Sequence, residues 1–381
     1  MKETDLTQGK IFHKLIKFSL PMIAGNLLQQ IYNLVDTLIV GRCLGADALA
    51  AVGSAYTLMI FITSIIIGLC MGSGAFFSED YGAGNQKKLK EDIWLSFWFI
   101  LSVSVVICAI IYPGMNFILW ILQTPKELMA LTREYVTVVF VGIIFVFLYN
   151  FFAYLLRSMG NSFMPLVFLA ISSVLNIVLD IWFVAGLNMG VGGAALATVI
   201  AQAVSGLGLL IYSMIKIPVL KNNHERTGFN IQRLKEIIIN DVATGIQQSV
   251  MNFGILMIQG LVNSFGTTIM ASFAAAVKID TIAYMPAQEF GNAYSLFVSQ
   301  NYGADEKDRI RKGTHISFVI SALFCVVISL MIFIFAENLM RIFIDADEIR
   351  IIAEGTRYLK IEGSMYVGIG VLFLWYGYFR G

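Results

Sequence analysis

The chain has 381 residues, of which 58% are hydrophobic and only 13% are charged, and its mean hydropathy is +0.77. Soluble domains usually carry about 25% charged residues, so this composition excludes an ordinary soluble protein and indicates an integral membrane protein. The net charge of +1 excludes the strongly basic surface typical of nucleic-acid-binding proteins, and we expect no nucleic-acid partner.

Ten apolar segments are long enough to cross a bilayer. A spanning helix needs about 20 mostly apolar residues, and backbone groups in lipid must be hydrogen-bonded within the segment, which favours helices. The sequence therefore predicts an all-α, polytopic membrane helix bundle. Its ten spans run approximately over 15–39, 51–77, 93–112, 132–156, 165–186, 191–215, 237–263, 268–299, 314–335 and 354–379.

The positions of the basic residues predict the orientation. Most of the 26 Lys and Arg residues fall on one side of the membrane when the N-terminus is placed in the cytoplasm, and Arg157 and Arg380 are then assigned to cytoplasmic span ends. Cytoplasmic loops are enriched in Lys and Arg. We therefore expect a multi-pass protein of the inner or plasma membrane with a cytoplasmic N-terminus.

An internal repeat relates the two halves of the chain. At a fixed offset of 221 residues, a triplet that follows a long apolar span and precedes a Lys-rich loop recurs, and single residues before it recur as well. When the offset is increased by two residues, two further pairs match. The matches are Gly45 with Gly266, Ala50 with Ala271, Ser78 with Ser299, Tyr81-Gly82-Ala83 with Tyr302-Gly303-Ala304, Tyr135 with Tyr358, and Arg157 with Arg380.

Six spans separate the copies, so both halves enter the membrane in the same direction. Parallel repeats of this kind are a transporter architecture with the substrate site near the midplane between the halves. We expect a first lobe over 1–217, a cytoplasmic linker over 218–235 and a second lobe over 236–381. The second repeat then has four of its six helices, and we expect a C-terminally truncated chain.

Two carboxylates lie inside apolar spans, at Asp36 and Asp180. A charge at membrane depth costs at least ~2.5 kcal/mol, so such residues usually face a polar interior and have a function there. Asn33 shares a helical face with Asp36, and Asn176 shares one with Asp180, because residues three and four apart are neighbours on a helix.

Ala194 and Thr198 repeat the four-residue spacing in the sixth span. Side-chain oxygens are offered by Asn33, Asp36, Asn176, Asp180 and Thr198. The small side chain of Ala194 leaves its backbone carbonyl within reach. Oxygen ligands suit hard cations such as Na⁺, and paired carboxylates can equally hold a proton. The alternative is that the polar residues only hydrogen-bond between helices.

The second half carries a different polar set. Lys278 and Asp280 stand two residues apart in the eighth span, so they do not share a helical face, and we expect them to line a cavity or to form a structural ion pair across helices. Glu289 follows Pro286, and a proline can free carbonyls that line a cavity.

Nucleotide-binding and hydrolase motifs are missing from the sequence: it contains no GxxxxGK[ST], HExxH or GxSxG pattern. We therefore expect no enzymatic activity and no cofactor beyond a coupling ion.

Four motifs carry a resemblance to a known family. They are Leu20-Pro21-Met22 leading to Tyr32-Asn33-Leu34-Val35-Asp36, then Leu44-Gly45-Ala46-Asp47-Ala48-Leu49-Ala50-Ala51-Val52-Gly53, Leu175-Asn176-Ile177-Val178-Leu179-Asp180, and Gly192-Gly193-Ala194-Ala195-Leu196-Ala197-Thr198. The chain resembles the multidrug and toxic compound extrusion (MATE) transporters. The resemblance implies two six-helix lobes that alternate between inward- and outward-open states and export amphipathic, often cationic compounds in exchange for Na⁺ or H⁺.

The resemblance also implies a site. In similar prokaryotic members the first-lobe cation site matches Asp36, Asp180, Asn176, Thr198 and the carbonyl of Ala194. Tyr135 and Asn150 fall at positions that line the cavity of that lobe.

Departures from the family pattern leave alternatives open. The seventh span lacks the glutamate that some relatives use in their second lobe, and helices eleven and twelve are absent from the sequence. The alternatives are a lipid or lipid-linked oligosaccharide flippase of the same superfamily, an inactive truncated fragment, and a membrane protein that does not transport. We expect a monomer whose partners are membrane lipid, a small amphipathic substrate and Na⁺ or H⁺.

Overall fold

The computed structural model describes residues 4–121, 125–221, 230–345 and 347–381, and these residues are helical with no β-strand among them. This confirms the all-α prediction. The helices are α1 (Ile11–Leu44), α2 (Ala46–Gly82), α3 (Gln86–Ile121), α4 (Met129–Val141), α5 (Ile143–Ser158), α6 (Phe163–Asp180), the π-helical turn η1 (Ile181–Gly186), α7 (Gly190–Lys216), α8 (Pro218–Lys221), α9 (Ile231–Asn263), α10 (Thr267–Gly303), α11 (Lys307–Met340), α12 (Ile349–Ser364) and α13 (Tyr366–Arg380).

The long helices follow the ten predicted spans in order. Six described helices are long and apolar enough to cross a membrane, and a seventh span arises if α4 and α5, bent by 43° at their junction, are one broken span. The remaining predicted spans correspond to α1, α9 and the pair α12–α13, which carry more polar side chains. Polar residues inside membrane helices usually face the protein interior.

The repeat is visible in the backbone. Helices α2 and α10 have 37 residues each, and each follows a glycine with positive φ, Gly45 at 88° and Gly266 at 92°. The turns after these helices also match, with φ of 67° at Gly84 and 57° at Asp305. L-residues other than glycine, asparagine and aspartate rarely adopt such φ values, so the two chain reversals are built alike.

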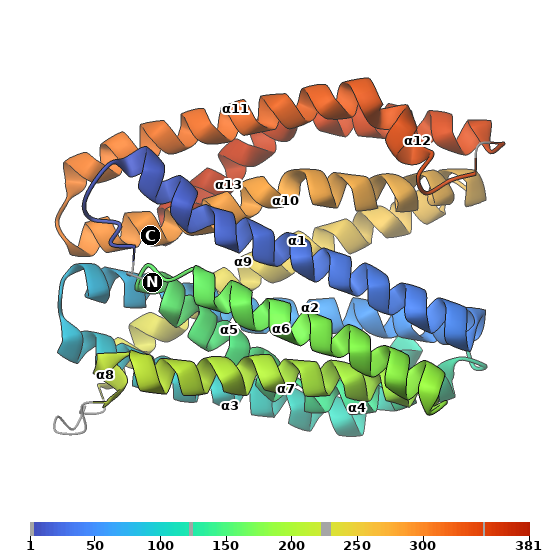
Figure 1. Cartoon of the computed structure of the whole chain (residues 1–381), viewed down its shortest axis with the longest axis horizontal. Helices are drawn as coiled ribbons and strands as arrows, with labels where there is room; N and C mark the ends of the chain where they lie inside the picture. The colour runs from blue at the N-terminus through green and yellow to red at the C-terminus, as the bar shows by residue number, and fades with distance from the viewer. Residues whose placement is uncertain (1–3, 122–124, 222–229, 346) are drawn as a thin grey trace.

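The two repeats lie side by side and meet along α1, α2, α9 and α10 (Figure 1). The first helix of each repeat packs against the second helix of the other: α1 contacts α10, and α9 contacts α2. Helices α2 and α10 also contact each other directly. The contact surface between repeats is therefore continuous, and polar groups on these four helices can be shared by both repeats.

The predicted linker is only partly described. Residues 218–221 form the short helix α8 and α9 begins at Ile231, while 222–229 lie outside the described residues. The lobe boundaries at 217 and 236 stay a prediction.

Candidate functional site

The predicted carboxylates of the first repeat face each other. Asp36 lies on α1 and Asp180 is the last residue of α6, and their side chains are 8% and 0% exposed. The two carboxyl groups lie within hydrogen-bonding range of each other. Asp180 directly precedes the π-helical turn η1, and such turns frequently occur at functional sites.

Further oxygens come from the neighbouring helices. The amide of Asn176 on α6 donates to the hydroxyl of Thr198 on α7 at 3.5 Å, and both residues are buried. Tyr32 on α1 and Tyr135 on α4 are neighbours of the same Thr198. Four helices thus contribute oxygens to one cluster.

Several oxygens of this cluster receive no hydrogen bond. Within the described residues, no donor reaches Asp36 Oδ1, Asn176 Oδ1 or either carboxylate oxygen of Asp180, although all are buried. Buried polar atoms are normally hydrogen-bonded, and an exception calls for a functional explanation. A donor set of carboxylate, amide and hydroxyl oxygens fits Na⁺, and two adjacent carboxylates can also share a proton.

The other first-repeat candidates are Ala194, Asn33 and Asn150. Ala194 is fully buried on α7, one turn before Thr198. Asn33 donates to the hydroxyl of Tyr56 on α2 at 3.3 Å, and Asn150 donates to the carbonyl of Val146 in its own helix at 2.8 Å. Both amides are thus engaged in contacts with groups other than the two carboxylates.

The expected ion pair of the second repeat does not form. Lys278 is exposed and makes no ion pair with a described residue, whereas Asp280 is buried and accepts a hydrogen bond from the hydroxyl of Tyr366 at 2.7 Å. The expectation of an ion pair was wrong. Positions two residues apart do not share a helical face, and here one side chain is exposed while the other is buried.

Glu289 is the centre of a polar network between the repeats. It accepts hydrogen bonds from Asn26 on α1 at 2.9 Å and from Asn292 at 3.2 Å, and Arg380 donates to the side-chain Oδ1 of Asn292 at 3.2 Å. The charges of Arg157 and Arg380 both act on Glu289.

These two arginines are a repeat pair that was predicted to lie at cytoplasmic span ends. Both lie at the ends of α5 and α13 and are partly buried there, while the side of the membrane stays a prediction. Their match in the repeat was the sequence signal that could have identified them as candidate functional residues, because a surface charge that occurs by chance need not recur.

The bundle is closed at the end where α2 and α10 finish. Residues 289–301 of α10 are all buried there. The Ser78 hydroxyl donates to the Leu296 carbonyl at 2.8 Å, and a side chain at Gly82 or at Gly303 would meet the carbonyl of Gln300 or of Glu79, respectively. The contact is reciprocal because the four residues form two repeat pairs.

The N-terminal segment 4–9 bridges the two repeats at this closed end. The Thr4 N–H donates to the Gly160 carbonyl at 3.1 Å, and the Leu6 N–H donates to Gln300 Oε1 at 3.0 Å. Gln300 in turn donates to the Ser158 carbonyl at 2.7 Å. The sequence carries no signal for this segment, because it binds through its own backbone groups, and its partners lie far away along the chain.

An ionic cluster ties α9 to the first repeat at the same end. Arg233 binds Asp92 through two hydrogen bonds of 2.9 and 2.5 Å, and lies 3.8 Å from Asp80, which also pairs with Lys88 at 3.0 Å. Asp92 is 0% exposed. A bidentate arginine–carboxylate pair is geometrically specific, so it fixes the position of α9 against α3.

A buried carboxylate on α9 also escaped the sequence reasoning. Asp241 is fully buried and accepts a hydrogen bond from the Ser73 hydroxyl at 2.6 Å, next to the bond from Asn240 to the Gly72 carbonyl at 3.1 Å. It lies near the start of α9 and links α9 to the glycine-rich stretch of α2.

These features define a class of protein. Two parallel helical repeats, spans broken by bends, and buried polar clusters within and between the repeats are the architecture of a secondary transporter. The family model for MatE matches residues 21–182 and 243–381, and the chain belongs to this family of membrane transporters, whose members are not enzymes.

Relatives and solved structures agree with this assignment. The chain is 32% identical to the "Probable multidrug resistance protein YpnP" of Bacillus subtilis (strain 168), covering 100% of this chain and 84% of that protein. It is 24% identical to the "Multidrug export protein MepA" of Staphylococcus aureus (strain MSSA476), covering 98% and 83%.

Two solved structures share the fold. One is described as the "Outward-facing conformation of a multidrug resistance MATE family transporter of the MOP superfamily", with a TM-score of 0.91 and 21% identity over 100% of this chain and 84% of that one. The other, "Crystal structure of MATE in the bent conformation", has a TM-score of 0.90 and 22% identity over 99% and 84%.

Proposed function

We propose that the protein is an antiporter that exports amphipathic, often cationic compounds in exchange for Na⁺ or H⁺. The observation that carries this proposal is the Asp36–Asp180 pair, whose buried oxygens lack hydrogen-bond donors among the described residues. Its relatives are named as multidrug resistance and multidrug export proteins, which supports the same substrate class.

Coupling would operate through the packing of α1. Two ionised carboxylates at hydrogen-bonding range repel each other, and a bound Na⁺ or a shared proton removes that repulsion, so loading favours the arrangement in which α1 and α6 are close. A ligand shifts an equilibrium only by its difference in affinity for the two states. We infer that the ion binds more tightly when Asp36 and Asp180 face each other.

We propose that the protein lies in the cell membrane with its N-terminus on the cytoplasmic side. The first two turns of α3 and α11, which carry Lys87, Lys88, Lys307 and Lys312, lie at the same end of the bundle as the start of α1, at the left of Figure 1. Positive charge favours the cytoplasmic side. The closed end of α2 and α10 is then cytoplasmic, which corresponds to an outward-facing state.

The test is dye efflux from cells that express the protein. Asp36→Asn should reduce gradient-driven efflux to near the level of empty-vector cells, because one neutral amide cannot replace the coupling carboxylate. Glu337→Gln is the matched control, since it removes a carboxylate with a 59% exposed side chain and should leave efflux unchanged. Normal efflux by Asp36→Asn would contradict the proposal.

The coupling ion is determined separately in liposomes. Substrate uptake is measured against a Na⁺ gradient at equal pH, and against a pH gradient without Na⁺. The coupling ion is the one whose gradient drives uptake by the wild type and fails to drive uptake by Asp180→Asn. Uptake that needs neither gradient would overturn the antiport mechanism.

The flippase alternative is less well supported. A site for lipid-linked phosphate needs several unbalanced cations, whereas Lys278 is exposed and the charges of Arg157 and Arg380 act on Glu289. Drug export therefore fits the charge distribution better.

A further inference from the structure

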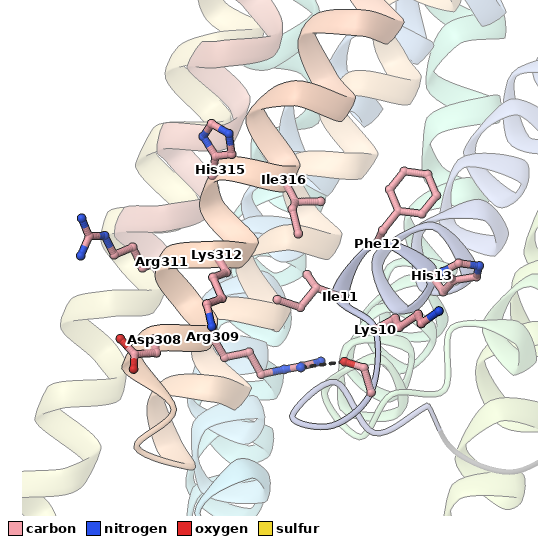
Figure 2. A pocket seen from close by; sticks show the side chains of 11 residues that line it. Lys10, Ile11, Phe12, His13, Asp308, Arg309, Arg311, Lys312, His315 and Ile316 are labelled. Atoms are coloured by element: carbon pink, nitrogen blue, oxygen red, sulfur yellow. Dashed lines mark hydrogen bonds between the residues drawn. The ribbon is translucent and has the colours of Figure 1, made fainter.

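A groove lies at the closed end of the bundle, between the first turns of α1 and α11 (Figure 2). Its volume is about 990 Å³. Ile11, Phe12 and Ile316 form an apolar wall, and Phe12 is 51% exposed. Figure 2 shows Ile11 and Ile316 in the gap between the two helices, with Lys312 and Arg309 nearer the start of α11.

The rim of this groove is strongly basic. Lys10, Arg309, Arg311 and Lys312 line it together with a single carboxylate, Asp308. Lys10, Arg311 and Lys312 are exposed, and none of them forms an ion pair with any residue in the described ranges. Their positive charges are therefore available to an anionic ligand.

The fourth cation connects the groove to the bridge between the repeats. Arg309 donates hydrogen bonds to the carbonyls of Leu6, Gln8 and Gly9 at 3.0, 3.1 and 2.8 Å. The guanidinium is thus held by neutral carbonyls and forms no ion pair within the described ranges, although the charges of Asp5 and Glu306 also act on it. An anion in the groove would reduce the repulsion between Arg309 and its basic neighbours, and so would support the bridging segment 4–9.

The groove lies at the boundary between charged and lipid-facing surface. One turn or more beyond it, α1 and α11 expose Leu20, Val319 and Leu323, at 56%, 54% and 65%. On α13, which packs against α11, the rings of Trp375 and Phe379 stack with centroids 5.6 Å apart. Exposed aromatic residues of this kind mark membrane–water interfaces.

We propose that this groove binds an anionic phospholipid, with its phosphate at Lys312 and an acyl chain along Ile11, Phe12 and Ile316, while Lys10 adds positive charge from the α1 side of the rim. The apolar wall would not be used by a free phosphate, and the unpaired cations would not be used by a neutral lipid. Basic pockets between membrane helices are a known means of holding lipid headgroups.

Native mass spectrometry of the detergent-purified protein tests this binding. Phosphatidylglycerol is titrated against the wild type and the double variant Lys10→Gln/Lys312→Gln, with phosphatidylcholine as the neutral probe. Each basic residue near an anionic surface contributes a large share of the attraction, so the double variant should bind phosphatidylglycerol about tenfold more weakly or worse. Phosphatidylcholine binding should not change.

The matched control is Lys87→Gln/Lys235→Gln, which removes two exposed lysines from the same end of the bundle, outside the groove. It should bind phosphatidylglycerol like the wild type. Equal weakening by both double variants would overturn the proposal, because attraction would then come from the general surface charge. Unchanged binding by Lys10→Gln/Lys312→Gln would overturn it as well.

A second arm separates phospholipid from soluble phosphate. Glycerol phosphate, which has the anionic headgroup without acyl chains, should fail to displace phosphatidylglycerol, and Phe12→Asn should weaken lipid binding. Displacement by glycerol phosphate at concentrations equal to the lipid would overturn a lipid site. Since these measurements need no transport, their outcome is independent of the proposed antiport activity.

Discussion

At the scale of single residues, part of the Asp36–Asp180 cluster was predictable because polar residues three or four apart share a helical face, as Asn176 and Asp180 do. Asp36 and Asp180 stand out in the sequence as carboxylates in apolar runs, and the structure brings them together with Asn176 and Thr198. Tyr32 was not selected, although its position four residues before Asp36 places it on the same face. Tyrosine is common in membrane helices, so its type alone carried little information.

Thr198 offers a residue-scale prediction for the cluster. Thr198→Val keeps the shape of the side chain and removes the hydroxyl that lies near Asn176, Tyr32 and Tyr135. A lost hydrogen bond of about 1–1.5 kcal/mol corresponds to roughly tenfold weaker ion binding. The measurement is the half-saturating Na⁺ or H⁺ concentration for transport in liposomes. Thr198→Ser, which retains the hydroxyl, should stay near the wild type, and equal values for Val and Ser would refute this role.

The buried pair of Asp92 and Arg233 supports a prediction about stability. Asp92→Asn leaves the guanidinium without its bidentate partner, and breaking a buried pair in this way costs about 3–5 kcal/mol. Unfolding in mixed micelles measures the loss. Glu236→Gln is the control, because Glu236 binds the same arginine at 2.9 Å with a side chain that is 49% exposed, and exposed pairs contribute about 0–1 kcal/mol. Similar losses for the two variants would contradict the assigned burial effect.

At the scale of helices, the sequence predicted the repeat and the ten spans well. Glycines at matching positions begin α2 and α10, and the break between α4 and α5 at Gly142 recurs between α12 and α13 at Met365. The sequence could not reveal which helices meet across the repeats. Those contacts depend on small residues and backbone carbonyls, such as Gly82 against Gln300, whose partners carry no distinctive residue type.

The glycine contact between α2 and α10 gives an element-scale prediction. Gly82→Ala places a methyl group against the Gln300 carbonyl, and overpacking of this kind costs the closed state about 1–3 kcal/mol. A cysteine at Ser78, which is 0% exposed, should then react about tenfold faster with a maleimide in a background without native cysteines. Gly53→Ala, on the same helix with open space around it, should leave the rate unchanged. An unchanged rate in Gly82→Ala would contradict the prediction, because the contact between α2 and α10 would then accommodate the methyl group.

At the scale of the whole molecule, three separate sets of contacts hold one end of the bundle closed. They are the α2–α10 contact, the Arg233 cluster, and the N-terminal segment that joins Gly160 to Gln300. Alternating access requires that such contacts break together when the lobes separate. Their number implies that no single contact decides the equilibrium, so removal of one should shift the balance between states while both remain populated.

Gln300 is the position where that expectation can be tested, because it joins the N-terminal segment and both repeats. Gln300→Ala removes the acceptor for the Leu6 N–H and the donor to the Ser158 carbonyl. Leaving these buried groups unpaired costs about 1–3 kcal/mol in the closed state. Spin labels at the exposed positions Lys87 and Lys307, one in each repeat, report the separation of the lobes by double electron–electron resonance. We expect a second, longer distance to be populated in Gln300→Ala and not in the exposed control Gln232→Ala. A single short distance in both variants would mean that the other two sets of contacts are sufficient to hold this end closed.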